Sequence, residues 1–103
     1  MYIVNVSFMV SPAAHGKWHE FVLHKFIPSL KADPRYGEIT FSRVLSSQVE
    51  SFFTYSLQVR LADIPAYKSF TEESFPEYQE FSAALFDAEV TYFISMMKII
   101  ETE

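Results

Sequence analysis

The chain has 103 residues, of which half are hydrophobic and 17% aromatic, and it carries a formal net charge of −5 without a single cysteine. This length predicts one domain over residues 1–103, and the lack of cysteine excludes disulfides and thiolate chemistry. Lysine and arginine are scattered singly, so we expect binding to neither nucleic acid nor an anionic membrane surface. No apolar run reaches the ~18 residues of a membrane span, and we expect a cytoplasmic protein.

Apolar and more polar residues alternate over residues 2–10, YIVNVSFMV, and this period of two predicts a first strand. One face of the strand is apolar, whereas Asn5 and Ser7 lie on the other face. The segment also lacks the basic residues that open a secretory signal peptide, so we interpret it as part of the fold.

Ser11 and Pro12 predict the start of a helix, because serine is a favourable N-cap and proline is tolerated at the first helical position. The helix is expected to run to about Phe26, where Pro28 limits it. A turn is expected next in residues 31–37, KADPRYG, which combine aspartate, proline and glycine.

Alternation returns in the middle of the chain and predicts two further strands. Residues 38–46 form the second predicted strand, and residues 46–51 are polar enough for a hairpin connection. Residues 53–61, FTYSLQVRL, then show the cleanest alternation in the chain and predict the third strand.

A second helical region is predicted over residues 64–90, with Asp63 as its N-cap and a break or kink at Pro76. Residues 92–100 are almost continuously apolar and predict the last strand. The resulting order, β-α-β-β-α-β, is typical of the ferredoxin-like fold. We therefore predict an α+β domain with a four-stranded antiparallel sheet and both helices on one face.

The other face of this sheet predicts a subunit interface. A chain of this size leaves about 40% of its unfolded surface exposed after folding, so its aromatic content indicates a further buried surface. The residues expected on this face are semi-polar: Asn5, Ser7, Thr54, Ser56, Gln58 and Arg60. We predict a homodimer in which two such sheets face one another and form a dimeric α+β barrel with a partly polar interior.

All three histidines lie in the first predicted helix, where the segment HEFVLH resembles a zinc-protease motif only superficially. His19 and His24 are five residues apart, so on a helix their rings point about 140° apart and do not share a metal. His15 and His19 have a spacing that suits a shared metal, but a third ligand would have to come from elsewhere in the chain, and no acidic cluster indicates one. We interpret these two as ordinary, partly exposed histidines and expect neither metal nor cofactor.

Four residues are candidates for a small-molecule site. Arg43 shares a predicted strand face with apolar residues. If its side chain is buried, the guanidinium needs a carboxylate partner, either from the chain or from a ligand. If Arg43 lies at the edge or end of the strand, its side chain extends into water instead. Trp18 lies on the apolar stripe of the helix and Asn5 on the first strand. Each is either a ligand contact or an interior residue whose polar atoms bond to other parts of the chain. His24, four residues after Glu20 on the polar helix side, is the remaining candidate.

Several segments together resemble a small bacterial family of unknown function with the dimeric α+β barrel fold. The resembling segments are YIVNV, His15-x-x-Trp18, Ile27-Pro28, the polar hairpin, and Tyr78-Gln-Glu-Phe81-x-x-x-Leu85 before Ala88-Glu89. The family pattern has one histidine before the Ile-Pro pair and another after the Ala-Glu pair, where this chain has Phe26 and Val90. The resemblance implies the dimeric α+β barrel fold over nearly the whole chain. Any function that those two histidines have in relatives is not implied for this chain, which lacks both.

The wider superfamily with this fold includes cofactor-free monooxygenases of aromatic polyketides and haem-degrading enzymes. The haem-degrading branch generally uses a histidine on the second helix as the axial ligand of the haem, together with an asparagine on the first strand. Asn5 is suitably placed for the second role, but no histidine follows His24, so the second predicted helix has no candidate for the axial ligand. We predict a homodimeric, non-catalytic ligand-binding or structural module with a small, partly apolar cavity. The alternative is a cofactor-free monooxygenase-like or isomerase-like enzyme with His24 or His15 as the base.

Overall fold

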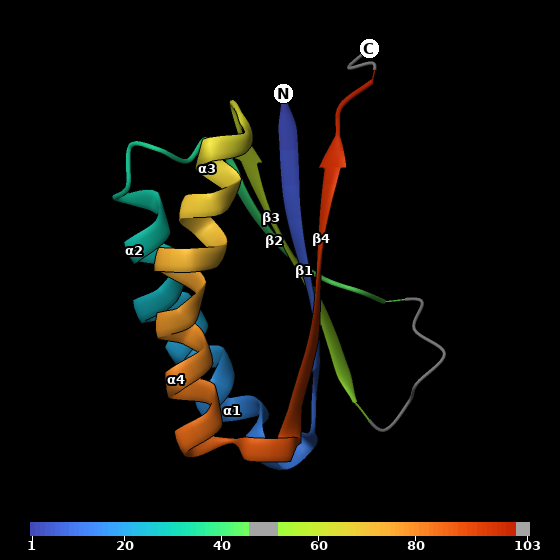
Figure 1. Ribbon diagram of the computed structural model, residues 1–103. Helices are drawn as coiled ribbons and strands as arrows, with labels where there is room; N and C mark the ends of the chain where they lie inside the picture. Colours follow the sequence, from blue (N-terminus) through green and yellow to red (C-terminus); the bar gives the residue numbers. More distant parts are fainter. Residues whose placement is uncertain (46–51, 101–103) are drawn as a thin grey trace.

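Four strands form one antiparallel sheet in the computed structural model, which describes residues 1–45 and 52–100. The strands lie in the order β2-β3-β1-β4, and the helices pack against one face of the sheet (Figure 1). None of the described helices covers the other face. The predicted ferredoxin-like α+β architecture is therefore confirmed. The strands are β1 Tyr2–Val10, β2 Ile39–Arg43, β3 Phe53–Leu61 and β4 Val90–Lys98.

The first helical segment runs without interruption from Pro12 to Lys31, past the proline expected to limit it. A π-helical turn, in which the Ile27 N–H bonds to the Val22 carbonyl, directly precedes Pro28. In this wider turn a backbone N–H bonds to the carbonyl five residues earlier rather than four. Because the hydrogen-bond pattern shifts just before the proline, its missing N–H does not end the helix. The predicted end before this proline is therefore wrong. The parts are α1 Pro12–Phe21, the π-helical turn Val22–Phe26 and α2 Ile27–Lys31.

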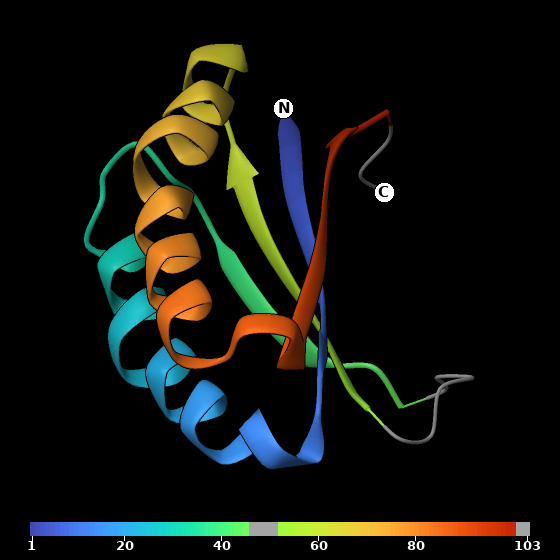
Figure 2. The same cartoon turned by 60° about the horizontal axis from the view of Figure 1, so that its bottom comes forward.

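The second helical segment repeats this arrangement, because a second π-helical turn precedes Pro76 and the helix continues through it. The helix ends at Leu85, short of the predicted residue 90, and a short turn leads into β4. There the Ser11 N–H donates to the Glu89 carbonyl over 2.9 Å, so the starts of α1 and β4 lie side by side (Figure 2). The parts are α3 Ile64–Ser69, the π-helical turn Phe70–Ser74, α4 Phe75–Leu85 and the 3-10 turn Asp87–Glu89.

The bounds of two strands differ from those predicted. β2 ends at Arg43 rather than at residue 46, and Leu45, which lies within the predicted strand, is 87% exposed. The hairpin connection predicted for residues 46–51 lies outside the described residues. β4 begins at Val90 and ends at Lys98, two residues earlier at both ends than the apolar run indicated.

The hydrophobic core lies between the helices and the sheet face turned toward them. Alternate residues of β1 and β3 are buried, as their sequence alternation predicts. The largest fully buried side chains include Trp18, Tyr78, Phe8, Phe70 and Phe75. Within the described ranges, every buried side-chain nitrogen and oxygen has a hydrogen-bond partner, and no helix is long and apolar enough to cross a membrane. Aromatic rings are therefore the largest side chains in the layer between helices and sheet.

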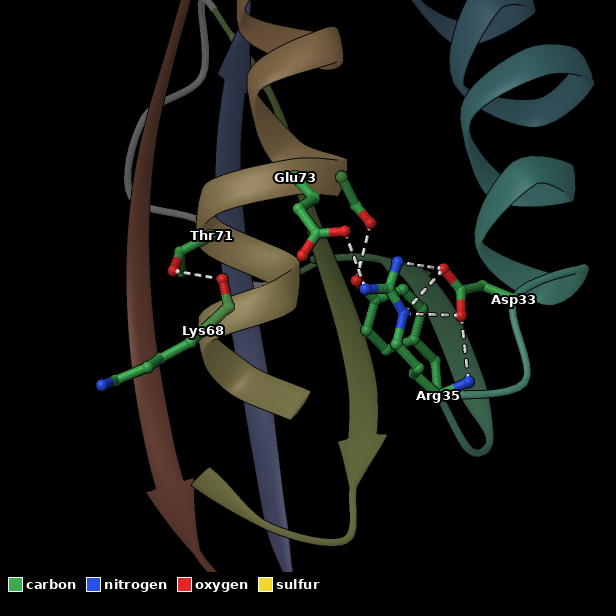
Figure 3. Close-up of polar contacts among 7 residues, drawn as sticks. Asp33, Arg35, Lys68, Thr71 and Glu73 are labelled. Carbon is green, nitrogen blue, oxygen red and sulfur yellow. Dashed lines mark hydrogen bonds and ion pairs between the residues drawn. The ribbon is translucent and has the colours of Figure 1, made fainter. Parts of the chain in front are cut away.

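Arg35 joins the loop after α2 to the second helical segment (Figure 3). Its guanidinium lies 2.7 Å from the Asp33 carboxylate and 2.8 Å from that of Glu73. The side-chain hydrogen bonds from Arg35 lower the pKa of Asp33 to about 2. The hydroxyls of Tyr36 and Ser74 are also in contact, 2.6 Å apart. These contacts hold the segment that leads into β2.

Candidate functional site

Two of the four residues predicted as ligand contacts, Trp18 and Arg43, lie next to Tyr55, whereas Asn5 and His24 lie elsewhere in the fold. Trp18 is fully buried in the core, where its Nε1–H donates to the Tyr78 hydroxyl over 2.8 Å. Asn5 lies on the sheet face turned away from the helices. Arg43 is exposed at the end of β2, and His24 is exposed on the outer side of the first helical segment. The described residues do not bring these four side chains together around one cavity.

Asn5 belongs to a polar network on the face that the helices leave uncovered, which we call the open sheet face. The Ser56 hydroxyl donates to Asn5 Oδ1 over 2.7 Å, and Asn5 Nδ2 donates to the Ser7 hydroxyl over 3.1 Å. The β4 side of this face is apolar, with Phe93 72% exposed and Met97 40% exposed. The open sheet face thus combines small polar side chains with exposed apolar ones.

The structure gathers a different set of side chains where α1 passes over the end of β2 and the start of β3. We call this set the histidine–aromatic cluster, and its members are His15, His19, Phe41, Arg43, Phe53 and Tyr55. At its centre His15 Nε2 lies 2.7 Å from the Tyr55 hydroxyl. Tyr55 is buried, Arg43 is exposed and the others are half-buried. The cluster is therefore rooted in the core but reachable from solvent.

Four rings of the cluster are nearly parallel. The Phe41 and Tyr55 rings lie 5.1 Å apart with 9° between their planes, and Tyr55 and His15 lie 5.7 Å apart with 16° between theirs. His15 stacks on Phe53 at 3.9 Å and 18°. The Arg43 guanidinium carbon lies 4.8 Å from the centre of the Phe53 ring. The result is a stack of flat groups with a guanidinium at Phe53, a favourable cation–π arrangement.

The electrostatic environment of the cluster favours a neutral His15. Its pKa is lowered, first by partial burial and then by the neighbouring His19 and Arg43, each of which disfavours a second positive charge. A neutral imidazole has one donor and one acceptor nitrogen, so Nε2 either accepts from the Tyr55 hydroxyl or donates to it. His24 differs, because it lies in solvent 3.7 Å from the Glu20 carboxylate.

Among the residues that the structure describes, no acidic side chain takes part in the cluster. In the part of the chain that the structure describes, Arg43 forms no ion pair, and no three histidine, aspartate or glutamate side chains gather into a group able to hold a metal. The pair His15–His19, with ring centres 5.5 Å apart, therefore has no third ligand among these residues. The cluster is equipped for stacking, hydrogen bonding and attraction of negative charge.

A surface groove of about 450 Å³ lies elsewhere, between α1 and the end of α4. Gly16, Lys17, Leu85 and Glu89 are among the residues that line it. Lys17 thus lies on a flank of α1 different from the one that carries the two histidines of the cluster. The groove and the cluster are separate features of the surface.

The sequence pointed to part of the cluster only. Arg43 was a candidate, and the spacing of His15 and His19 already placed their rings on one flank of the helix. The contribution of Phe53 and Tyr55 depends on which strand lies beneath that flank, and His15 and Tyr55 are 40 residues apart. Periodicity alone does not report such a contact.

Three solved structures illustrate how widely this fold is shared. A candidate antibiotic biosynthesis monooxygenase from Deinococcus radiodurans is 14% identical, with 100% of this chain and 96% of that one covered and a TM-score of 0.78. A dimeric ferredoxin-like protein from an uncultured marine organism is 9% identical, with coverages of 99% and 97% and a TM-score of 0.72. SnoaB, a cofactor-independent oxygenase from Streptomyces nogalater, is 14% identical, with coverages of 98% and 95% and a TM-score of 0.65. At such identities the similarity shows the fold alone.

No curated protein sequence matches this chain. One family model does, and it matches residues 1–100, nearly the whole length. The match agrees with the resemblance to a family of unknown function that the sequence segments carry. The chain therefore belongs to the family described as Domain of unknown function (DUF4286).

Proposed function

We propose that the protein is a homodimeric, non-catalytic module that binds a small, flat, partly apolar molecule at the histidine–aromatic cluster. The observation that carries this proposal is the stack of nearly parallel rings around the 2.7 Å contact between His15 and Tyr55. Half-buried ring faces beside polar groups are typical of small-molecule sites. The buried polar side-chain atoms of the described core already have hydrogen-bond partners, which favours the half-buried cluster over the core as a site.

The second part of the proposal is that two copies of this chain pair through the open sheet face. Phe93 and Met97 expose large apolar side chains there, which is unfavourable in an isolated chain. Packing against the same face of a second copy removes them from water and keeps the Asn5–Ser56 hydrogen bond. The similarity to a solved protein described as dimeric supports this choice of partner. Because the cluster lies on the helix side of the sheet, such a dimer leaves it accessible.

The dimer is tested by changing one exposed apolar residue on each side of the molecule. Phe93→Glu is expected to convert the dimer to a monomer, because it places one charge from each copy within the proposed interface. Leu85→Glu is the matched control, since Leu85 is 60% exposed on α4, away from the open sheet face. Light scattering coupled to size-exclusion chromatography gives the mass. A monomeric parent protein, or a Phe93→Glu variant that stays dimeric, contradicts the interface.

The binding part is tested with an uncharged probe, benzyl alcohol. The three histidines give three imidazole Cε1–H signals in the NMR spectrum, and His24 serves as an internal reference. Benzyl alcohol is expected to shift the His15 and His19 signals only. Phe53→Ala is expected to abolish these shifts, whereas Phe52→Ala, at an exposed neighbouring position, retains them. Equal shifts of all three signals, or none, contradict the site.

One observation favours a second candidate function, proton abstraction by His15 in a cofactor-free oxygenase. The lowered pKa keeps the imidazole neutral, and the Tyr55 hydroxyl orients it, as a general base requires. The fold similarity to a cofactor-independent oxygenase adds support by analogy only. Oxygen uptake with 1,4-dihydroxynaphthalene, corrected for its spontaneous oxidation, is the test. Uptake that His15→Gln removes and His24→Gln keeps establishes this function over simple binding.

A further inference from the structure

We propose that the histidine–aromatic cluster selects planar anions, and that its ligand class is aromatic carboxylates, whose ring packs on the parallel rings of the cluster and whose carboxylate binds Arg43. This inference rests on the proposed binding function and deepens it by naming the chemistry of the ligand. It follows from three properties of the cluster, which are its charge, its flatness and its link to a proton.

The basic groups of the cluster are one permanent cation, Arg43, and two histidines that become positive only when protonated. Arg43 comes from β2, and His15 and His19 come from α1, while the groups that face them from β3 are the uncharged Phe53 and Tyr55. The acidic residue of α1, Glu20, lies beside His24 instead. In a chain with a net charge of −5, this is a local region of positive potential without an acidic partner among the described residues.

The flatness of the cluster limits the shape of the ligand. The Phe41, Tyr55, His15 and Phe53 rings are parallel within 18° from each to the next, and the planar guanidinium of Arg43 lies over Phe53. An aromatic ring placed on this stack adds another parallel layer. A carboxylate in the plane of that ring then meets the guanidinium, which binds carboxylates through two parallel hydrogen bonds. An acyl chain or a tetrahedral anion gains only one of these two contacts.

The third property is a link between ligand binding and protonation. In the free protein Arg43 and His19 disfavour a proton on His15, and Tyr55 occupies its Nε2. An anion in contact with Arg43 offsets that repulsion, so binding is expected to raise the pKa of His15 and to be accompanied by proton uptake. The affinity for an anion therefore increases as the pH falls through the range in which His15 titrates. An uncharged ligand lacks this dependence.

The test compares benzoate with benzamide, a neutral molecule of nearly the same shape. The imidazole Cε1–H signals of His15 and His19 are followed by NMR at about pH 6 and about pH 8, on either side of the usual histidine pKa. Benzoate is expected to bind about tenfold more tightly than benzamide at the lower pH, the ratio that one charge-assisted pair confers. This preference is expected to shrink at the higher pH, and the His24 signal is expected to stay unchanged by either probe.

Variants separate charge from fold. Arg43→Gln is expected to abolish the preference for benzoate over benzamide, and the His15 and His19 signals of the unliganded variant report whether the cluster is folded. Arg43→Lys keeps the charge without the planar group and is expected to fall between the two. Lys17→Gln removes a cation from the other flank of α1 and is expected to change neither affinity.

The outcomes distinguish the two proposals. Equal affinities of benzoate and benzamide, with both probes shifting His15 and His19, overturn selection of anions and leave the binding function standing. The absence of any shift at His15 and His19 with either probe overturns both. A benzoate preference that survives Arg43→Gln contradicts the assigned role of the guanidinium.

Discussion

Trp18 and Tyr78 are joined by a hydrogen bond of 2.8 Å in the centre of the core, where neither side chain is exposed to solvent. Trp18 comes from α1 and Tyr78 from α4, so the bond connects the two helical segments directly. Both rings also pack edge-on against Phe8 of β1, at 5.2 and 5.3 Å. Burial raises the pKa of Tyr78, so its hydroxyl stays protonated. The two segments and the sheet thus meet at three aromatic residues.

Removing the acceptor of this bond is expected to destabilise the fold. Tyr78→Phe leaves the indole N–H of Trp18 buried without a partner, which costs about 1–3 kcal/mol of the free energy of unfolding. Tyr92→Phe is the control, because the Tyr92 hydroxyl accepts its hydrogen bond from Gln79 at the surface and its loss costs about 0.5 kcal/mol or less. Urea unfolding followed by far-UV circular dichroism measures both. Equal losses in the two variants contradict the importance of the buried bond.

The lowered pKa of His15 predicts how the stability of the fold depends on pH. The unfolded chain binds a proton at His15 with a pKa of about 6.5, whereas the folded chain binds it only at lower pH. The folded state therefore loses stability as the pH falls below about 6.5, until the folded His15 is also protonated. Urea unfolding at about pH 7.5 and 5.5 brackets this window.

A substitution assigns this pH dependence to one residue. His15→Gln is expected to flatten the stability difference between the two pH values, whereas His24→Gln, in an exposed position, is expected to retain it. If the His15→Gln protein loses as much stability on acidification as the parent, another group is responsible.

Much of the fold was predictable because its signals are local. Alternation located β1 and β3 to the residue, and the order of elements was sufficient for the ferredoxin-like topology. The helix ends were not predictable in the same way. Pro28 and Pro76 normally limit a helix, and only the π-helical turns before them allow each helix to continue. Neither the apolar periodicity nor the capping residues of the sequence indicate such a turn.

The candidate site was less predictable, because it is made by tertiary contacts. The sequence is compatible with Trp18 as a core residue or as a ligand contact, and its burial and its bond to Tyr78 place it in the core. Arg43 gains its neighbours from α1 and β3 only after the helix has packed on the sheet. Asn5 lies on the opposite sheet face from both, which the alternation of β1 already implied.

The ion pairs of Arg35 predict an unusual titration at Asp33. The hydrogen bonds from the guanidinium hold the pKa of Asp33 at about 2, below the ordinary value of about 3.9. The contribution of this carboxylate to stability is therefore present above about pH 3.9 and is lost as the pH falls toward 2. NMR titration of the side-chain carboxyl carbon measures the pKa. Arg35→Gln is expected to raise the Asp33 pKa toward the ordinary value, although the backbone N–H of residue 35 still donates to Asp33. Lys68→Gln, elsewhere on the surface (Figure 3), is expected to leave the pKa low. An ordinary Asp33 pKa in the parent protein contradicts the ion pair.

The two glycines predict opposite effects of the same substitution. A Cβ atom added at Gly16 meets nothing within 4 Å, and the residue lies within α1, so Gly16→Ala is expected to stabilise the fold by about 0.5–1 kcal/mol through helix propensity. A Cβ at Gly37 would lie 3.1 Å from the Arg60 carbonyl oxygen, the same oxygen that accepts the Gly37 N–H at 2.8 Å. Gly37→Ala therefore has to push the chain away from β3 and is expected to destabilise it by about 1–3 kcal/mol. Urea unfolding of both variants measures the difference. An unchanged free energy of unfolding in Gly37→Ala would contradict this prediction, because it would mean that the segment before β2 moves away from Arg60 at little cost.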